Sequence, residues 1–128
     1  MEALTTNGIR ISVKPKYEAQ YSKPVHNKYV FSYTVTIENQ SSNAVQLLRR
    51  HWHIWDASGN NHEVEGEGVI GKQPIIEPGH YHQYASWCEL ESGIGKMYGS
   101  YLMQQQHNGH LFEARIPVFL MYAYVRMN

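Results

Sequence analysis

Two pairs of histidines are spaced so that they could hold a metal ion. The pairs are His51 with His53 and His80 with His82. Residues two apart on a β-strand share a face, so each pair could chelate a metal ion, and two pairs on adjacent strands would form a site. The carboxylates needed to complete the site are absent from both histidine strands. We therefore expect cobalt or zinc to bind no more tightly than about micromolar.

A glycine motif, Gly66-x-Gly68-x-x-Gly71, matches the dinucleotide-binding fingerprint letter by letter. In that fingerprint the glycines open a helix whose N-terminus holds the pyrophosphate. Here Pro74 and Pro78 follow, and nothing downstream has helical periodicity. The motif therefore predicts positive φ or a bulge where a strand leaves a sheet.

The alternative for the glycine motif is an anion site. Successive backbone N–H groups could hold a phosphate in a nest, with Arg49 or Arg50 as the charge partner. Glu65 and Glu67 lie inside the motif and would repel phosphate. We favour the simpler role for the two arginines, as cross-strand partners of these glutamates.

Cys88 is the only cysteine, so no intramolecular disulfide can form. It could act as a nucleophile if a histidine lay beside it. A lone cysteine next to Trp87 in a strand is more often a small buried hydrophobic residue, which is the interpretation we favour. We predict no catalytic residue and no enzymatic activity.

These side chains must be positioned by β-strands, because alternation of apolar and polar residues is the dominant pattern in the chain. It is clearest from Tyr29 to Ile37, where every second residue is apolar. Turn signals rich in Asn, Ser, Gly and Pro separate the apolar runs, and Pro15 and Pro117 suit edges or bulges. The pattern predicts an all-β antiparallel sandwich of about seven or more strands, of the immunoglobulin or fibronectin type III kind. The predicted strands begin at Ile9 and Tyr29 and then cover 44–56, 61–67, 80–89, 96–105 and 111–121.

The segments 44–56 and 61–67 should form a hairpin around Ser58 and Gly59. With one residue of uncertainty, the register places Arg50 opposite Glu67, Trp52 opposite Glu65, and Ile54 opposite Glu63. Alternation places most of the large residues of this region in the core, and any that face outward would suit binding of a partner. These residues are Trp52, Trp55, Tyr98, Tyr101 and Met103.

Composition and charge limit the classes of partner that we expect for this protein. The 128 residues form one domain, 1–128, with 11 basic and 11 acidic side chains and no run long enough to span a membrane. A neutral balance gives no field that attracts nucleic acid or an anionic membrane, so we expect neither partner. The start of the chain lacks the features of a signal peptide, and we expect a soluble cytoplasmic protein.

Several segments in fixed order make the sequence resemble the ApaG family from about residue 8 to about residue 122. The segments are Phe31-x-Tyr33-x-Val35-x-Ile37-x-Asn39, Leu47-Leu48-x-Arg50-x-Trp52, Val64-x-Gly66-x-Gly68-Val69-Ile70-Gly71-x-Gln73-Pro74, Pro78-Gly79, Tyr84-x-Ser86, Gly95-x-Met97-x-Gly99-x-Tyr101-x-Met103 and Ile116-Pro117-x-Phe119. The resemblance implies a fibronectin type III-like β-sandwich without established enzymatic activity. It also implies an association with cobalt and magnesium resistance and a proposed affinity of the glycine motif for pyrophosphate.

We therefore predict a non-enzymatic binding module without a cofactor. A protein partner would engage the sheet face and the loop from Gly66 to Gly79, whose glycines and prolines fix one backbone path. The sequence does not decide whether the protein forms a homodimer. The first alternative is a binder of pyrophosphate-containing nucleotides through Gly66, Gly68, Gly71, Arg49 and Arg50. The second is a role in binding of, or resistance to, divalent metals such as cobalt or magnesium through His51, His53, His80 and His82.

Overall fold

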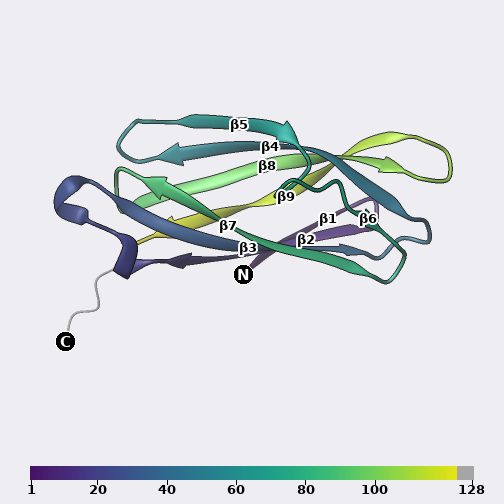
Figure 1. Cartoon of the computed structure of the whole chain (residues 1–128), viewed down its shortest axis with the longest axis horizontal. Helices are drawn as coiled ribbons and strands as arrows, with labels where there is room; N and C mark the ends of the chain where they lie inside the picture. Colours follow the sequence, from purple (N-terminus) through teal and green to yellow (C-terminus); the bar gives the residue numbers. More distant parts are fainter. Residues whose placement is uncertain (124–128) are drawn as a thin grey trace.

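The computed structural model describes residues 1–123 and contains two antiparallel sheets packed face to face (Figure 1). In the described residues, helix is confined to two short 3-10 turns, η1 (Ala19–Tyr21) and η2 (Pro24–His26), and none is long and apolar enough to cross a membrane. The strands are β1 (Glu2–Thr6), β2 (Ile9–Tyr17), β3 (Tyr29–Asn39), β4 (Val45–Asp56), β5 (His62–Glu67), β6 (Ile75–Ile76), β7 (Tyr81–Leu90), β8 (Ile94–Gln105) and β9 (Leu111–Tyr122).

The first sheet has the order β1-β2-β3-β7, and the second has the order β5-β4-β8-β9, with the short β6 paired to β4. The predicted antiparallel sandwich is confirmed. Sequence analysis missed β1 and β6. β1 is mostly exposed and β6 has two residues, so neither carries a buried face long enough to produce clear alternation.

The core lies between the sheets and consists of the alternating inward side chains of both. Trp52 contacts the rings of Tyr33, Tyr101 and Phe119, with centroid distances of 5.5, 6.3 and 6.0 Å. Trp52, Tyr101 and Met103 are buried as predicted, whereas Trp55 and Tyr98 are 38% exposed on the outer face of the second sheet.

Both strand prolines lie where a missing N–H donor does no harm. Pro15 lies beyond the last residue of β2 that pairs with β1, so β3 is its only neighbour there. Pro117 lies in the edge strand β9, where the register with β8 shifts between Met97 and Gly99. The prediction that these residues mark an edge or a bulge is confirmed.

The predicted β4–β5 hairpin forms, and its register differs from the predicted one by one residue, which is the uncertainty given with the prediction. Arg50 lies opposite Gly66, Trp52 opposite Val64, and Ile54 opposite His62. The glutamates of β5 therefore lie opposite the outward residues of β4: Glu67 faces Arg49, Glu65 faces His51, and Glu63 faces His53. Because side chains alternate between faces, a slip of one residue moves every side chain of a strand to the other face of the sheet.

Asp56, the last residue of β4, connects the end of this hairpin to the turn between β7 and β8 by hydrogen bonds. Its carboxylate accepts hydrogen bonds from the N–H groups of Ser58 and Glu91, at 3.0 and 2.7 Å, and from the Ser92 hydroxyl at 2.6 Å. Burial by itself would raise the pKa of Asp56, but these donors outweigh it and lower the pKa. The charged carboxylate therefore stabilises the hairpin at neutral pH.

Candidate functional site

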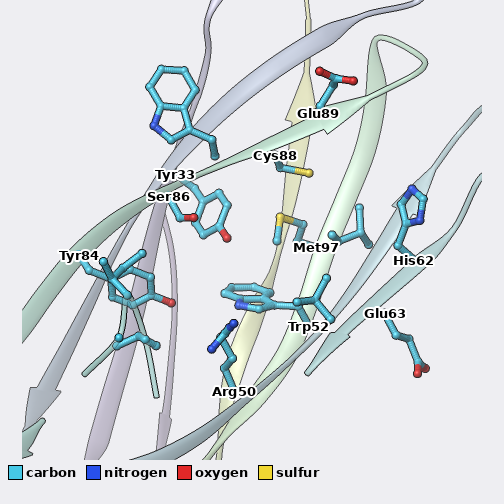
Figure 2. A pocket seen from close by; sticks show the side chains of 16 residues that line it. Tyr33, Arg50, Trp52, His62, Glu63, Tyr84, Ser86, Cys88, Glu89 and Met97 are labelled. Carbon is cyan, nitrogen blue, oxygen red and sulfur yellow. The ribbon is translucent and has the colours of Figure 1, made fainter. Parts of the chain in front are cut away.

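A cleft of about 550 Å³ opens between the two sheets, beside the β4–β5 hairpin on one side and β7 on the other. Figure 2 shows its walls: Arg50 and Trp52 from β4 face Tyr33, Tyr84 and Ser86 from the first sheet. The glycine loop contributes the remaining wall through its apolar residues. The cleft therefore combines apolar walls with polar groups, among them one arginine and several hydroxyl groups, and concave sites of this kind commonly bind ligands.

Arg50 is half-buried in this cleft because its inward position on β4 directs it between the sheets. Its Nη1 donates hydrogen bonds to the backbone carbonyls of Glu67 and Gly68, at 2.9 and 3.0 Å. No carboxylate of residues 1–123 forms an ion pair with it. The expected pairing of Arg50 with a glutamate is therefore wrong, and its positive charge is balanced only by carbonyl dipoles.

Three tyrosines surround this charge from the first sheet and from β8. Tyr84 and Tyr101 form a short hydroxyl–hydroxyl hydrogen bond. Burial raises the pKa of Tyr33, Tyr84 and Tyr101, although Arg50 acts in the opposite direction on each. All three phenols are therefore protonated at neutral pH. Tyr101 is fully buried and bonded to Tyr84, so Tyr33 and Tyr84 are the two that can donate hydrogen bonds to a bound group. Sequence analysis named Tyr33, Tyr84 and Ser86 in the segments of the family resemblance but not among the candidate site residues.

Cys88 also lines the cleft and is buried. Burial raises the pKa of the thiol to about 11, with further contributions from the charges of Asp56 and Glu89. The thiol is therefore protonated at neutral pH, whereas nucleophilic attack requires a thiolate. The interpretation of Cys88 as a small buried residue is confirmed.

The glycine motif shapes a tight loop at the rim of the cleft. Gly68 has a φ of +61°, and a Cβ added there would lie 2.1 Å from the carbonyl oxygen of Lys72. Val69 and Lys72 exchange two backbone hydrogen bonds around a two-residue turn. The prediction of positive φ is confirmed at Gly68 and at Gly71, which has a φ of +73°.

Gly66 serves a different purpose, since it has no positive φ. A Cβ at Gly66 would lie 2.9 Å from both terminal nitrogens of Arg50, so the missing side chain leaves room for the guanidinium. Arg49 points to the opposite face of β4, where its cross-strand neighbour is Glu67. Of the two arginines predicted for an anion site, the structure therefore brings only Arg50 to the glycine loop.

Ile70 stands out within the same loop. It occupies the first central position of the turn with a φ of +47°, which a β-branched residue rarely adopts. Its side chain is 62% exposed and lines the cleft. Strain of this kind costs about 1–3 kcal/mol and tends to occur at functional positions, so Ile70 is a candidate recognition residue.

The two histidine pairs do not meet, because β4 lies in one sheet and β7 in the other. His82 contacts Tyr84, with centroids 6.3 Å apart, and its pKa is lowered by burial and by Lys72. His51 and His53 instead lie together on the outer face of the second sheet, next to Glu63 and Glu65. The prediction that the histidine strands lack carboxylates overlooked these neighbours on β5.

Comparison with known proteins gives consistent matches over most of the chain. The sequence model described as the ApaG domain matches residues 19–105. The protein named Protein ApaG from Brucella abortus (strain S19) is 46% identical over 119 residues, which cover 93% of this chain and 91% of the relative. The homologue of that name from Brucella anthropi is 47% identical with the same coverage.

A solved structure described as an ApaA protein from Bordetella pertussis superposes with a TM-score of 0.86. It is 41% identical, and the match covers 89% of this chain and 92% of that structure. A second X-ray structure, a structural-genomics target, gives a TM-score of 0.85 at 44% identity, with 91% and 88% coverage. The fold and the sequence therefore point to the same family.

Proposed function

This chain belongs to the ApaG domain family, and we propose that it is a non-enzymatic binding module. Its site is the cleft between the sheets, and its ligand is an extended segment of a partner protein. That segment places a carboxylate against Arg50 and an apolar side chain beside Trp52. The observation that carries the proposal is a half-buried arginine, held in a cleft, that has no carboxylate partner within residues 1–123.

The geometry around Arg50 favours a carboxylate. Both hydrogen bonds of the guanidinium to the loop use Nη1, and no described residue accepts a hydrogen bond from Nη2 or Nε. Those atoms suit an incoming carboxylate, and charge-assisted hydrogen bonds of this kind are stronger than neutral ones. The Tyr33 and Tyr84 hydroxyls can supply further donors.

The rim supports binding of a protein segment. Val64, Ile70 and Trp87 line the cleft and are 40%, 62% and 54% exposed, so apolar groups surround the entrance. Trp87 is held in place by an edge-to-face contact with Tyr21, at 5.4 Å between centroids. Aromatic and aliphatic anchors around a polar centre are typical of protein recognition sites.

The edges of the cleft favour an extended segment. β5 and β7 each pair with a strand on one side only, so two open strand edges flank the entrance. An extended peptide can add to such an edge through main-chain hydrogen bonds while its side chains enter the cleft. Glu89 at the rim should favour basic residues that flank the inserted carboxylate.

Binding without catalysis agrees with the chemistry of the cleft. Its thiol and its phenols all have raised pKa values, so none is ionised near neutral pH. No side chain that lines the cleft combines an activated nucleophile with a base bonded to it in the described structure. The groups in the cleft are suited to hold a ligand by hydrogen bonds and apolar contact.

A phosphate-containing nucleotide remains the second candidate because Arg50 does contact the glycine loop. The loop itself gives this candidate less support. Gly68 and Glu67 turn their carbonyl oxygens, not their N–H groups, toward the guanidinium. The N–H groups of Gly68, Val69 and Lys72 already donate to backbone carbonyls, which leaves fewer donors for a phosphate nest.

The test is a selection of random peptides on the wild-type protein, with counter-selection on Arg50→Met. We expect enriched peptides to share an acidic residue beside an apolar one. They should bind the wild type at least tenfold more tightly than the variant, on the order of 1.4 kcal/mol. Arg50→Lys should restore little of the affinity, because an ammonium group lacks the planar fork of guanidinium.

Two outcomes would overturn the proposal. One is a set of peptides that bind wild type and Arg50→Met equally well. The other is a titration with ATP that saturates at low-micromolar concentration and is abolished in Arg50→Met. That result would establish the phosphate candidate instead.

A further inference from the structure

A second cluster of chemically active side chains lies on the other side of the β4–β5 hairpin. His51 and His53 project outward from β4, while Glu63 and Glu65 project outward from β5 directly opposite. The cleft with Arg50 is on the inner face of the same strands, so the two groups of side chains are separated by the sheet. Whatever the cluster does is independent of the function proposed for the cleft.

The ring of His51 is held by Glu65. Its Nδ1 lies 3.2 Å from Oε1 of Glu65. In the neutral ring, the tautomer with its proton on Nδ1 faces this carboxylate and has its lone pair on Nε2. Within residues 1–123, that Nε2 is the only buried side-chain nitrogen or oxygen without a hydrogen-bond partner. The Oε2 atom of Glu63 lies 3.8 Å from this Nε2. A buried nitrogen lone pair without a hydrogen-bond partner, next to a carboxylate, can coordinate a cation.

His53 completes the cluster from the next outward position. Its ring stacks on Tyr98 of β8, with centroids 4.9 Å apart and an interplanar angle of 9°, and lies 4.5 Å from the ring of His51. Its Nδ1 is 3.1 Å from Oε1 of Glu63. One ligand atom from each of His51, His53 and Glu63 lies within 4.8 Å of the others.

From this geometry we propose that His51, His53 and Glu63 bind one divalent transition-metal ion of the zinc or cobalt kind, with Glu65 as the outer carboxylate that orients His51. Two imidazoles and a carboxylate form one of the ligand sets that hold such ions. A histidine ligand commonly has a carboxylate beside its other ring nitrogen, and Nδ1 of His51 lies 3.2 Å from Oε1 of Glu65. Magnesium and calcium prefer oxygen ligands throughout and should bind far more weakly.

The surroundings leave a fourth ligand position accessible. The histidines border an open groove of about 810 Å³ across β8 and β9, which is also lined by Ser100, Glu113 and Arg115. Three protein ligands beside open space leave room for water or a small anion on the metal. The groups around the cluster thus provide ligands, an orienting carboxylate and solvent access.

The experiment uses the untagged full-length protein and ZnCl₂ in calorimetry, with CoCl₂ and visible absorption as the second readout. Wild type should bind one equivalent of zinc, and His53→Ala and Glu63→Gln should each weaken binding at least tenfold. Glu65→Gln should weaken it by about 10–100-fold, the range for loss of an orienting carboxylate. Cobalt should show the intense visible absorption of a low-coordinate site in the wild type only.

Two variants of the same hairpin serve as controls. Glu67→Gln removes an equal charge from the outer face of β5, but the residue opposite Glu67 on β4 is Arg49 and not a histidine. His62→Ala removes a histidine that lines the cleft instead of the cluster. Both should bind zinc within twofold of wild type, and the melting temperature without metal should show that every variant is folded.

Three results would overturn the proposal. Wild type could fail to saturate at one equivalent. Glu67→Gln or His62→Ala could lose as much affinity as Glu63→Gln, which would indicate zinc bound diffusely by surface groups. Finally, His53→Ala and Glu63→Gln could bind zinc as tightly as the wild type, which would show that the contacts between these side chains are ion pairs only.

Discussion

The two faces of the β4–β5 hairpin carry opposite kinds of site. The inner face presents Arg50, a cation without a carboxylate partner among residues 1–123, inside a cleft between the two sheets. The outer face presents Glu63 and Glu65 against two histidines on an open surface. Alternation along two paired strands is enough to separate a site for an anion from a site for a cation by the thickness of one sheet.

The two sites also differ in how their residues are brought together. The cleft depends on an unusual backbone, with positive φ at Gly68, Ile70 and Gly71. The histidine cluster depends on ordinary strand pairing, which sets His51 opposite Glu65 and His53 opposite Glu63. Substitutions in the loop should therefore affect folding and the cleft, whereas substitutions in the cluster should affect metal binding with little effect on stability.

The largest expected effect is that of Gly68→Val. The new side chain would be strained at positive φ and would overlap the carbonyl of Lys72. The free energy of unfolding should therefore fall by at least about 3 kcal/mol. Gly71→Val is the matched control, because it has a similar φ but no atom within 4 Å of an added Cβ. Gly71→Val should lower the free energy of unfolding by about 1–3 kcal/mol. Urea denaturation compares them, and an equal loss in both would contradict the steric account.

Asp56→Asn should disturb both faces, because Asp56 closes the hairpin that they share. Loss of the charged acceptor should reduce the unfolding free energy by about 2–3 kcal/mol at pH 7. The folded-state pKa is lowered, so this stabilisation is complete above the unfolded value of about 3.9 and is lost as the pH falls through the folded value. Denaturation curves from pH 7 to pH 2 should show wild type and variant converge at the acid end. A difference that persists there would show that the charge is not the cause.

Ile70→Asn should change stability and binding in opposite directions. Asparagine tolerates positive φ, so relief of strain should stabilise the fold by about 1 kcal/mol. The same change removes an exposed apolar group from the rim and should weaken selected peptides about two- to tenfold. Val25→Asn, at an exposed apolar residue in η2, should change neither property. If Ile70→Asn lowered the melting temperature, the strain interpretation would be wrong.

The smallest expected effects come from two variants that should leave binding at the other site unchanged, which tests whether the two sites are independent. Arg50→Met should bind zinc within twofold of wild type, because its side chain points away from the histidines. His53→Ala should bind the selected peptides within twofold, because its ring lies outside the cleft. Calorimetry measures both affinities on the same preparations. Loss of zinc binding in Arg50→Met would show that the two faces are coupled.

Sequence analysis predicted the sandwich well, because alternation over long strands such as β3 is strong and local. It also identified the glycine motif as a backbone feature, since Pro74 and Pro78 exclude the helix that a dinucleotide site requires. What it missed depends on contacts between distant strands. The register of β4 and β5 depends on where the turn is centred, and an error of one residue moved Glu63 and Glu65 to the wrong face.

The same limit explains the treatment of the two histidine pairs. Their spacing correctly placed His51 and His53 on one face, but nothing local shows that β7 belongs to the other sheet from β4. The tyrosines of the cleft were hidden for a related reason: Tyr33 and Tyr84 alternate like core residues, and only the packing of two sheets shows that their hydroxyls border Arg50.

The most direct test of separate sites on the two faces is side-chain NMR on one labelled sample, titrated first with zinc and then with a selected peptide. Zinc should shift the ring signals of His51 and His53 and leave the Trp87 indole and the Arg50 Nε signal unchanged. The peptide should do the reverse. If both ligands shifted the same signals, or if zinc acted mainly on histidines other than His51 and His53, the account of two separate sites would be contradicted.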